Sequence, residues 1–174
     1  PIQMLIQDFI YDFSQIGIPY DNVDEEFLIK PRKWDTKGLG TFMNVMGPVS
    51  SVIDVLAFLS FWFILGYNGT LSESYFQTAW FIECLISETL IIHFVRTSKI
   101  PFVQSRANIV LTSLTMITII GTILAPILLH NINSFHFEIM PPLYYMIVIG
   151  LTILYVILVQ IVKKRYIKKV GSWL

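Results

Sequence analysis

The chain has 174 residues, of which 55% are hydrophobic and only 14% are charged, and its mean hydropathy is +0.66. Because about a quarter of the residues of a typical soluble domain are charged, this composition indicates a membrane protein. Twelve Lys and Arg balance twelve Asp and Glu. A net charge of zero gives no basis for nucleic-acid binding.

The first segment, residues 1–19, is largely apolar but is interrupted by glutamines and aspartates. We expect it to form a polar transmembrane helix that carries acids of an ion site. Gly17 and Pro19 are expected to end this helix, because proline has no amide hydrogen and glycine is common just past a helix end. Since neither a methionine nor a signal peptide opens the sequence, we expect the chain to be part of a longer protein.

Asp8 and Asp12 are four residues apart in this segment, so a helix places them on one face. A charged aspartate near the centre of a bilayer costs roughly 2.5–3.5 kcal/mol, and the two charges repel each other. A bound cation, a proton or hydrogen bonds must compensate them. The alternative is that both acids are protonated and join helices by hydrogen bonds, or that Asp12 is solvated near the interface.

Residues 20–41 carry mixed charges and are predicted to be a cytoplasmic loop. Crossing a bilayer takes about 20 apolar residues. Runs of sufficient length follow at about 42–67, 78–95, 108–130 and 143–162, and they predict a four-helix support bundle within residues 42–174. Together with the first segment, they predict an all-α membrane bundle of five transmembrane helices.

All Lys and Arg lie before the first of these apolar runs, between residues 96 and 106, or between residues 163 and 169. The other two connections, 67–77 and 130–142, contain none. By the positive-inside rule, the basic loops and the C-terminus are cytoplasmic and the protein crosses the plasma membrane several times. The basic tail is interpreted as a topology anchor, with binding of anionic lipids as the alternative.

The ionisable residues inside the predicted spans are mainly acidic: Asp54, Glu83 and Glu88. This bias predicts a lining that favours cations. Glu83 and Glu88 diverge by about 140° around a helix, so only one should face a shared site, and we expect Glu83 to be solvated near the outer end. Ser87, Glu88 and Thr89 offer oxygens that suit a hard cation such as Mg²⁺ or Ca²⁺.

Several other residues favour structural interpretations. Cys84 is the only cysteine, which excludes a disulfide framework within the chain, and we expect it to serve packing. His93 has no second His or Cys nearby and is also expected to be structural. The tryptophans fall near predicted span boundaries and are expected to be interface anchors: Trp34, Trp62, Trp80 and Trp173.

Five segments carry a resemblance to a known family: PIQMLIQDFIYDFSQIGIPYDNVD, FLIKPRKWD, GPVSSVIDV, WFIECLISETLIIHFVRTSKIPF and YIKKVGSW. The sequence resembles the C-terminal membrane half of a P-type ATPase, closest to the bacterial magnesium-importing branch. The resemblance spans nearly the whole chain. It implies that residues 1–19 form the sixth transmembrane helix of a pump and that the later spans are the seventh to tenth.

The resemblance also implies a set of metal ligands. Asp12 corresponds to the family's ion-binding carboxylate on the sixth helix, and Tyr11 takes the neighbouring polar position. Asp8 falls where the family commonly has an asparagine ligand, and Glu88 falls where related calcium pumps contribute a ligand. Magnesium pumps usually have Asn at the position of Asp8 and Gln at that of Glu88, so two carboxylates here replace amides.

The function implied is ATP-driven transport of Mg²⁺, with Ca²⁺ as the rival ion. ATP would bind only in cytoplasmic domains outside this chain, which has no DKTGT motif and no catalytic residue and is expected to be inactive alone. The expected partners are the rest of the same polypeptide and the lipid bilayer, and the 20–41 loop is expected to relay motion from the phosphorylation domain. The alternatives from other classes are a proton-coupled secondary transporter and a membrane scaffold.

Overall fold

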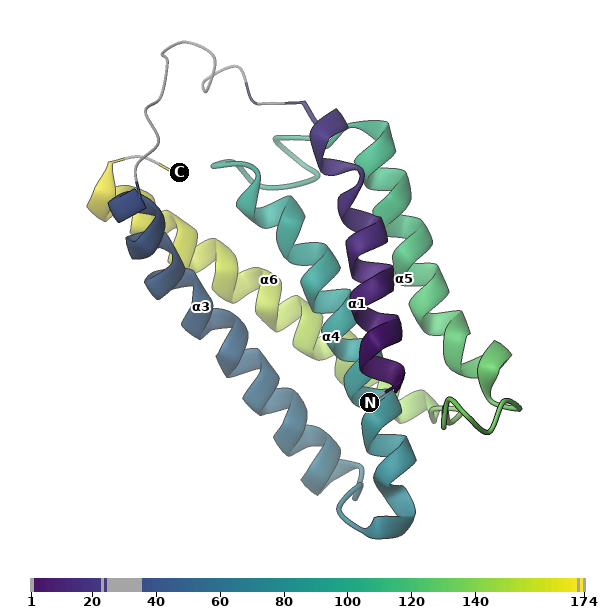
Figure 1. Cartoon of the computed structure of the whole chain (residues 1–174). Coiled ribbons are helices and arrows are strands. Elements are labelled where there is room, and N and C mark those ends of the chain that lie inside the picture. Colours follow the sequence, from purple (N-terminus) through teal and green to yellow (C-terminus); the bar gives the residue numbers. More distant parts are fainter. Residues whose placement is uncertain (1, 23, 25–35, 172, 174) are drawn as a thin grey trace.

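The computed structural model describes residues 2–22, 24, 36–171 and 173, so Trp34 and most of the first basic loop lie outside the described residues. The described part is helical, and it contains no β-strand. The all-α prediction is confirmed (Figure 1). The helices are α1 (Ile2–Gln15), η1 (Ile18–Tyr20), α3 (Thr36–Leu59) with the π-helical η2 (Ser60–Ile64), η3 (Thr70–Ser72), α4 (Glu73–Val95), α5 (Ile109–Leu129) and α6 (Pro142–Val170).

Within the described residues, four helical stretches are long and apolar enough to cross a membrane: Gly38–Ile64, Thr70–Val95, Ile109–Leu129 and Pro142–Val170. They coincide with the four apolar runs predicted from the sequence. The last helix is longer than predicted, because nothing in the basic segment after residue 162 stops it. It ends at Gly171, whose left-handed φ of 85° suits a glycine and whose amide donates to the carbonyl of Ile167 at 2.8 Å.

Helix α1 lies between α4 and α5 and contacts both (Figure 1). Its 14 residues span about 21 Å, which is shorter than a hydrocarbon core of about 30 Å. The helix buries polar side chains, among them Gln3 and Gln7, against the bundle. Its large apolar side chains, such as Phe9 at 76% exposure, point away from the bundle. This polar-in, apolar-out pattern suits a lipid or protein environment, and a full crossing by this segment stays a prediction.

The chain leaves α1 close to α5. The sequence predicted that Gly17 helps to end the first helix, and α1 indeed ends at Gln15. Gly17 has an ordinary right-handed conformation, with φ of −73°. A Cβ at this position would lie 2.9 Å from Leu114 Cδ1 and 3.1 Å from Leu111 Cα. The missing side chain therefore allows the close approach of the two segments.

Two apolar clusters hold the helices together. Phe61, Phe81 and Tyr144 are central to the first, which joins α4 to α6 and to the end of the α3 segment. Phe42 and Tyr155 belong to the second, which joins α3 to α6. These contacts fix α3, α4 and α6 relative to one another. Helix α1 packs against α4 with its polar face.

Candidate functional site

A cavity of about 400 Å³ lies where α1, α3 and α4 face one another, and we call it the inner cavity. One acid comes from each helix: Asp8 from α1, Asp54 from α3 and Glu88 from α4. No Lys, Arg or His is found among the described residues that line it. The rest of the lining is Met4, Gln7, Ser50, Ile53, Trp80, Cys84, Ser87, Ile91 and Tyr155. The potential of these walls therefore favours cations.

Gln7 connects the two sides of the inner cavity. It is buried on α1, and its amide nitrogen lies 3.4 Å and 3.5 Å from the two carboxylate oxygens of Glu88. The amide thus donates toward the carboxylate and orients it toward α1. This role of Gln7 was not predicted from the sequence, although the spacing of Gln3 and Gln7 signals a polar face next to the acids.

Hydroxyl groups form part of the wall as well. Ser50 Oγ and Tyr155 Oη lie 2.9 Å apart, which joins α3 to α6 beside Asp54. Ser87 lines the cavity but donates its hydroxyl to the carbonyl of Cys84 at 2.9 Å. Thr89, predicted to offer an oxygen with Ser87, is fully buried and donates within its own helix instead. Only Ser87 and Glu88 of that predicted group reach the cavity.

The structure brings together two of the four predicted metal ligands. Asp8 and Glu88 line the same cavity. Tyr11 is half-buried against the first apolar cluster. Asp12 lies about one helical turn after Asp8 on α1, and its side chain is exposed. Among the described residues, no three His, Cys, Asp or Glu side chains are grouped closely enough to hold a metal ion. A complete coordination shell would need oxygens from elsewhere, including retained water.

Glu83 differs from its prediction. It was expected to be solvated near the outer end of its span, but it is only 3% exposed, so that prediction is wrong. The side chain is enclosed because it falls on the side of α4 that packs in the bundle, and one of its oxygens has no partner in the described part of the chain. As predicted from the divergence of the two glutamates, it does not line the inner cavity with Glu88.

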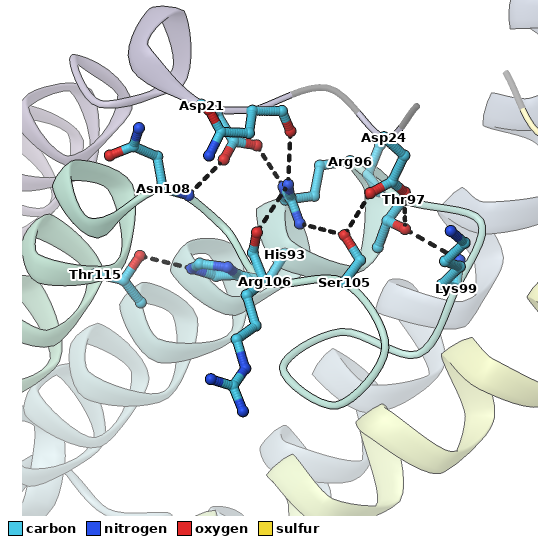
Figure 2. Close-up of polar contacts among 12 residues, drawn as sticks. Asp21, Asp24, His93, Arg96, Thr97, Lys99, Ser105, Arg106, Asn108 and Thr115 are labelled. Atoms are coloured by element: carbon cyan, nitrogen blue, oxygen red, sulfur yellow. Dashed lines mark hydrogen bonds and ion pairs between the residues drawn. The ribbon is translucent and has the colours of Figure 1, made fainter. Parts of the chain in front are cut away.

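Two residues that were predicted to be structural, Cys84 and His93, are buried. Cys84 is 9% exposed and His93 is 1% exposed. His93 Nε2 lies 2.8 Å from Thr115 Oγ1, a hydrogen bond that joins α4 to α5 (Figure 2). This contact fits the structural role expected for His93.

A polar cluster lies at the far end of α4, where the segment after α1 meets the connection between α4 and α5 (Figure 2). Arg96 forms an ion pair with Asp21. Its guanidinium also donates to the carbonyl of Asn22 at 2.9 Å and to Ser105 Oγ at 3.0 Å. The amide of Asn108 donates to Asp21 at 2.8 Å. Arg96 is therefore the centre of a bond network between two loops.

Asp24 extends the same cluster. Its carboxylate accepts hydrogen bonds from Thr97 at 2.5 Å and from Ser105 at 2.7 Å. Burial by itself would raise the pKa of Asp24, but these hydrogen bonds and the nearby charges of Lys99 and Arg96 lower it below the ordinary value. Asp24 is consequently a carboxylate at neutral pH and holds its loop to the 96–108 connection.

The C-terminal segment also reaches this end of α4. Lys163 is 1% exposed, and its ammonium donates to the carbonyls of Thr97 at 2.8 Å and Lys99 at 3.2 Å. The indole of Trp173 donates to the carbonyl of Val95 at 2.9 Å. Trp173 is 3% exposed. The prediction that Trp173 is an interface anchor is wrong, because its ring is enclosed by the chain's own residues.

Four apolar helices of spanning length define a multi-pass membrane protein, and two of them, α3 and α4, share with α1 a cavity that is lined by acids. The chain belongs to the family described as cation transporting ATPase, C-terminus, whose family model matches residues 1–165. It is 40% identical over 173 residues to the magnesium-transporting ATPase, P-type 1, of Salmonella typhimurium strain LT2. It is 37% identical over 172 residues to the protein of the same name from Escherichia coli K12.

These matches cover 99% and 98% of this chain but only 19% of each relative. The chain thus spans about a fifth of the length of the curated relatives it matches. The family predicted from the sequence segments is confirmed. The magnesium transport that the relatives' names state is a property of those full-length proteins.

Proposed function

We propose that this chain forms the C-terminal membrane part of an ATP-driven Mg²⁺ transporter of the plasma membrane. One observation carries the proposal: Asp8, Asp54 and Glu88 reach a single cavity from three helices, with no basic side chain among the described lining residues. The names of the relatives support Mg²⁺ as the ion. ATP hydrolysis would take place in domains outside this chain.

Within this proposal, the cation is held by Asp8 and Glu88, with Asp54 adding charge. Asp12 and Tyr11 lie on α1 outside the inner cavity, and the exposed carboxylate of Asp12 is available to helices beyond this chain. Mg²⁺ sheds water reluctantly and is often bound by one or two carboxylates with several waters retained. A cavity of about 400 Å³ leaves room for such a partly hydrated ion.

The proposed topology follows the basic residues. α1 is the first crossing, and the 96–108 connection and the C-terminus face the cytoplasm. In this arrangement, the cluster around Arg96 lies on the side of the ATP-hydrolysing domains. Motion of those domains would act on α1 through the loop that Asp21 and Asp24 attach to α4.

The test uses the full-length transporter expressed in a bacterial strain that lacks its own Mg²⁺ uptake systems. We expect wild type to restore growth at low Mg²⁺, and Asp8→Asn, Asp54→Asn and Glu88→Gln to require more Mg²⁺ for half-maximal growth. The matched control is Glu138→Gln, since Glu138 lies near His130 and outside the inner cavity. Unchanged Mg²⁺ requirement in all three cavity variants contradicts the proposal.

The identity of the ion is tested with the purified full-length protein. We expect phosphorylation by ATP to depend on Mg²⁺ at the transport site, and Ca²⁺ to support it less well. Asp8→Asn and Glu88→Gln place amides at these two positions, as in the magnesium pumps that the sequence resembles. The two substitutions therefore remove the additional negative charge of this site. A stronger response to Ca²⁺ than to Mg²⁺ in wild type would identify a calcium pump.

A further inference from the structure

Glu83 is an acid near the middle of α4 that does not line the inner cavity. It is 3% exposed, and its neighbours Ile82 and Leu85 on the same helix are fully buried in the first apolar cluster. That cluster draws its side chains mainly from α3, α4 and α6 of this chain. The rest of a full-length polypeptide therefore cannot contact Glu83 while these helices stay packed.

The carboxyl group of Glu83 has few hydrogen-bond partners. Its Oε2 atom is buried and has no hydrogen-bond partner in the described part of the chain. The thiol of Cys84 lies next to the carboxyl group, but a thiol is only a weak donor. Tyr144 faces Glu83 from α6, and it donates its hydroxyl hydrogen to the carbonyl of Ala79 at 2.8 Å. A charged carboxylate at this place would therefore lack the donors that replace the water around it.

Opposite charge is missing around Glu83 as well. The sequence has no Lys or Arg between residues 38 and 95 or between residues 107 and 162, which form most of the surrounding helices. Among the described side chains, the charged ones that act on Glu83 are both acids, Asp54 of α3 and Glu88 of α4. Removing an ionised carboxylate from water without a counter-charge costs far more free energy than binding a proton, so such a group becomes neutral.

We propose that Glu83 is a proton-binding site, a neutral carboxylic acid that keeps one proton in the folded protein at neutral pH and does not exchange it for the transported cation. The titratable groups that face this site are Asp54 from α3, Cys84 and Glu88 from α4, and Tyr144 and Tyr155 from α6. Because Glu83 does not line the inner cavity, its proton and a cation in that cavity occupy different places. The proton keeps negative charge out of the contact between α3, α4 and α6, whichever cation is carried.

Infrared spectroscopy of the purified full-length protein tests the site. A protonated carboxyl group has a C=O stretching band that is separate from the carboxylate bands and that moves in D₂O. At neutral pH, we expect Glu83→Gln to remove the intensity of one carboxyl group from this acid band and to leave the carboxylate bands unchanged. The matched control is Glu73→Gln, since Glu73 lies on the same helix but is exposed, and it should leave the acid band unchanged. Loss of carboxylate intensity in Glu83→Gln, with the acid band intact, would overturn the inference.

Addition of Mg²⁺ to wild type distinguishes a retained proton from an exchanged one. The Glu83 band is the acid band that is missing from Glu83→Gln, and we expect it to persist in excess Mg²⁺. Disappearance of this band on addition of Mg²⁺ would show that the proton is exchanged for the cation, and it too would overturn the inference. The readout does not depend on transport. A wild type that fails to restore growth at low Mg²⁺ refutes the proposed function and leaves the proton site standing.

A second variant covers the case in which Glu83→Gln does not fold. Glutamine brings two N–H donors that need acceptors, whereas methionine has no such donor and fills irregular gaps in apolar cores. Glu83→Met also keeps the position neutral, so we expect it to fold, to unfold at a temperature close to that of wild type and to lack the Glu83 band. Absence of folded protein in both variants would mean that the position needs a charge, which contradicts a neutral acid.

Discussion

The amide of Gln7 on α1 lies 3.4 Å and 3.5 Å from the two carboxylate oxygens of Glu88 on α4, so one side chain holds both oxygens of a cavity acid. The contact joins the helix that carries Asp8 to the helix that carries Glu88. At these distances the hydrogen bonds are long. Their effect is therefore expected to be on the orientation of Glu88 more than on stability.

Gln7→Leu should weaken cation binding. Removing a hydrogen bond of this kind costs about 1 kcal/mol, which corresponds to roughly a fivefold higher Mg²⁺ requirement. The measurement is the Mg²⁺ concentration that gives half-maximal uptake by the full-length protein. Gln15→Leu is the matched control, since Gln15 lies on the same helix but outside the inner cavity. An equal effect of both substitutions would mean that Gln7 acts only through the packing of α1.

Arg96→Ala should destabilise the end of the bundle where the loops meet. The substitution leaves Asp21 without its ion partner, and removing one member of a buried pair costs about 3–5 kcal/mol. The side chains of Arg96 and Asp21 are 9% and 13% exposed, so the pair is close to fully buried and a cost near this range is expected. The readout is the thermal unfolding midpoint of purified protein.

The matched control for that substitution is Arg106→Ala. Arg106 is exposed and belongs to the same connection between α4 and α5. Surface substitutions usually change stability by about 0.5 kcal/mol or less. If Arg96→Ala and Arg106→Ala shift the midpoint equally, the network around Arg96 does not hold the loops together.

The fold was largely predictable from the sequence, because a helix that crosses the bilayer needs a long run of apolar residues and such runs are visible in the sequence. The runs that predicted four spans correspond to α3 with η2, α4, α5 and α6. The extension of α6 beyond residue 162 was missed, because basic residues end a hydrophobic run without ending a helix. Helix propensity is high for Lys and Arg.

The inner cavity was predictable only in part. An acid inside a span is a local signal, and it identified Asp8 and Glu88. Whether two such acids share a cavity depends on the packing of α1 against α4, which no spacing within one segment reveals. Gln7 and Tyr155 were missed because their polar partners lie far away in sequence, at residues 88 and 50. The burial of Lys163 was missed for the same reason.

The attachment of Asp24 should depend on pH. Its folded-state pKa is lowered, so its contribution to stability is fully present above the ordinary Asp value of about 3.9 and is lost as pH falls through the lower folded-state pKa. The charges that act on it are Arg96, Lys99 and Lys163. We expect the unfolding midpoint to fall more steeply below about pH 4 in wild type than in Asp24→Asn. Parallel curves would exclude Asp24 as a contributor.

Lys163→Met should loosen the connection after α4 without shortening α6. The ammonium donates to the carbonyls of Thr97 and Lys99, and Met keeps the length of the side chain but cannot donate. The loss is expected to cost about 1–3 kcal/mol, because buried acceptors lose their partner. Hydrogen exchange of residues 96–108 should become faster in Lys163→Met. Lys164→Met is the control, since Lys164 is exposed one position later on α6, and its exchange should match wild type. Faster exchange in both variants would indicate that the charge of the tail, not the buried contact of Lys163, stabilises this end of the bundle.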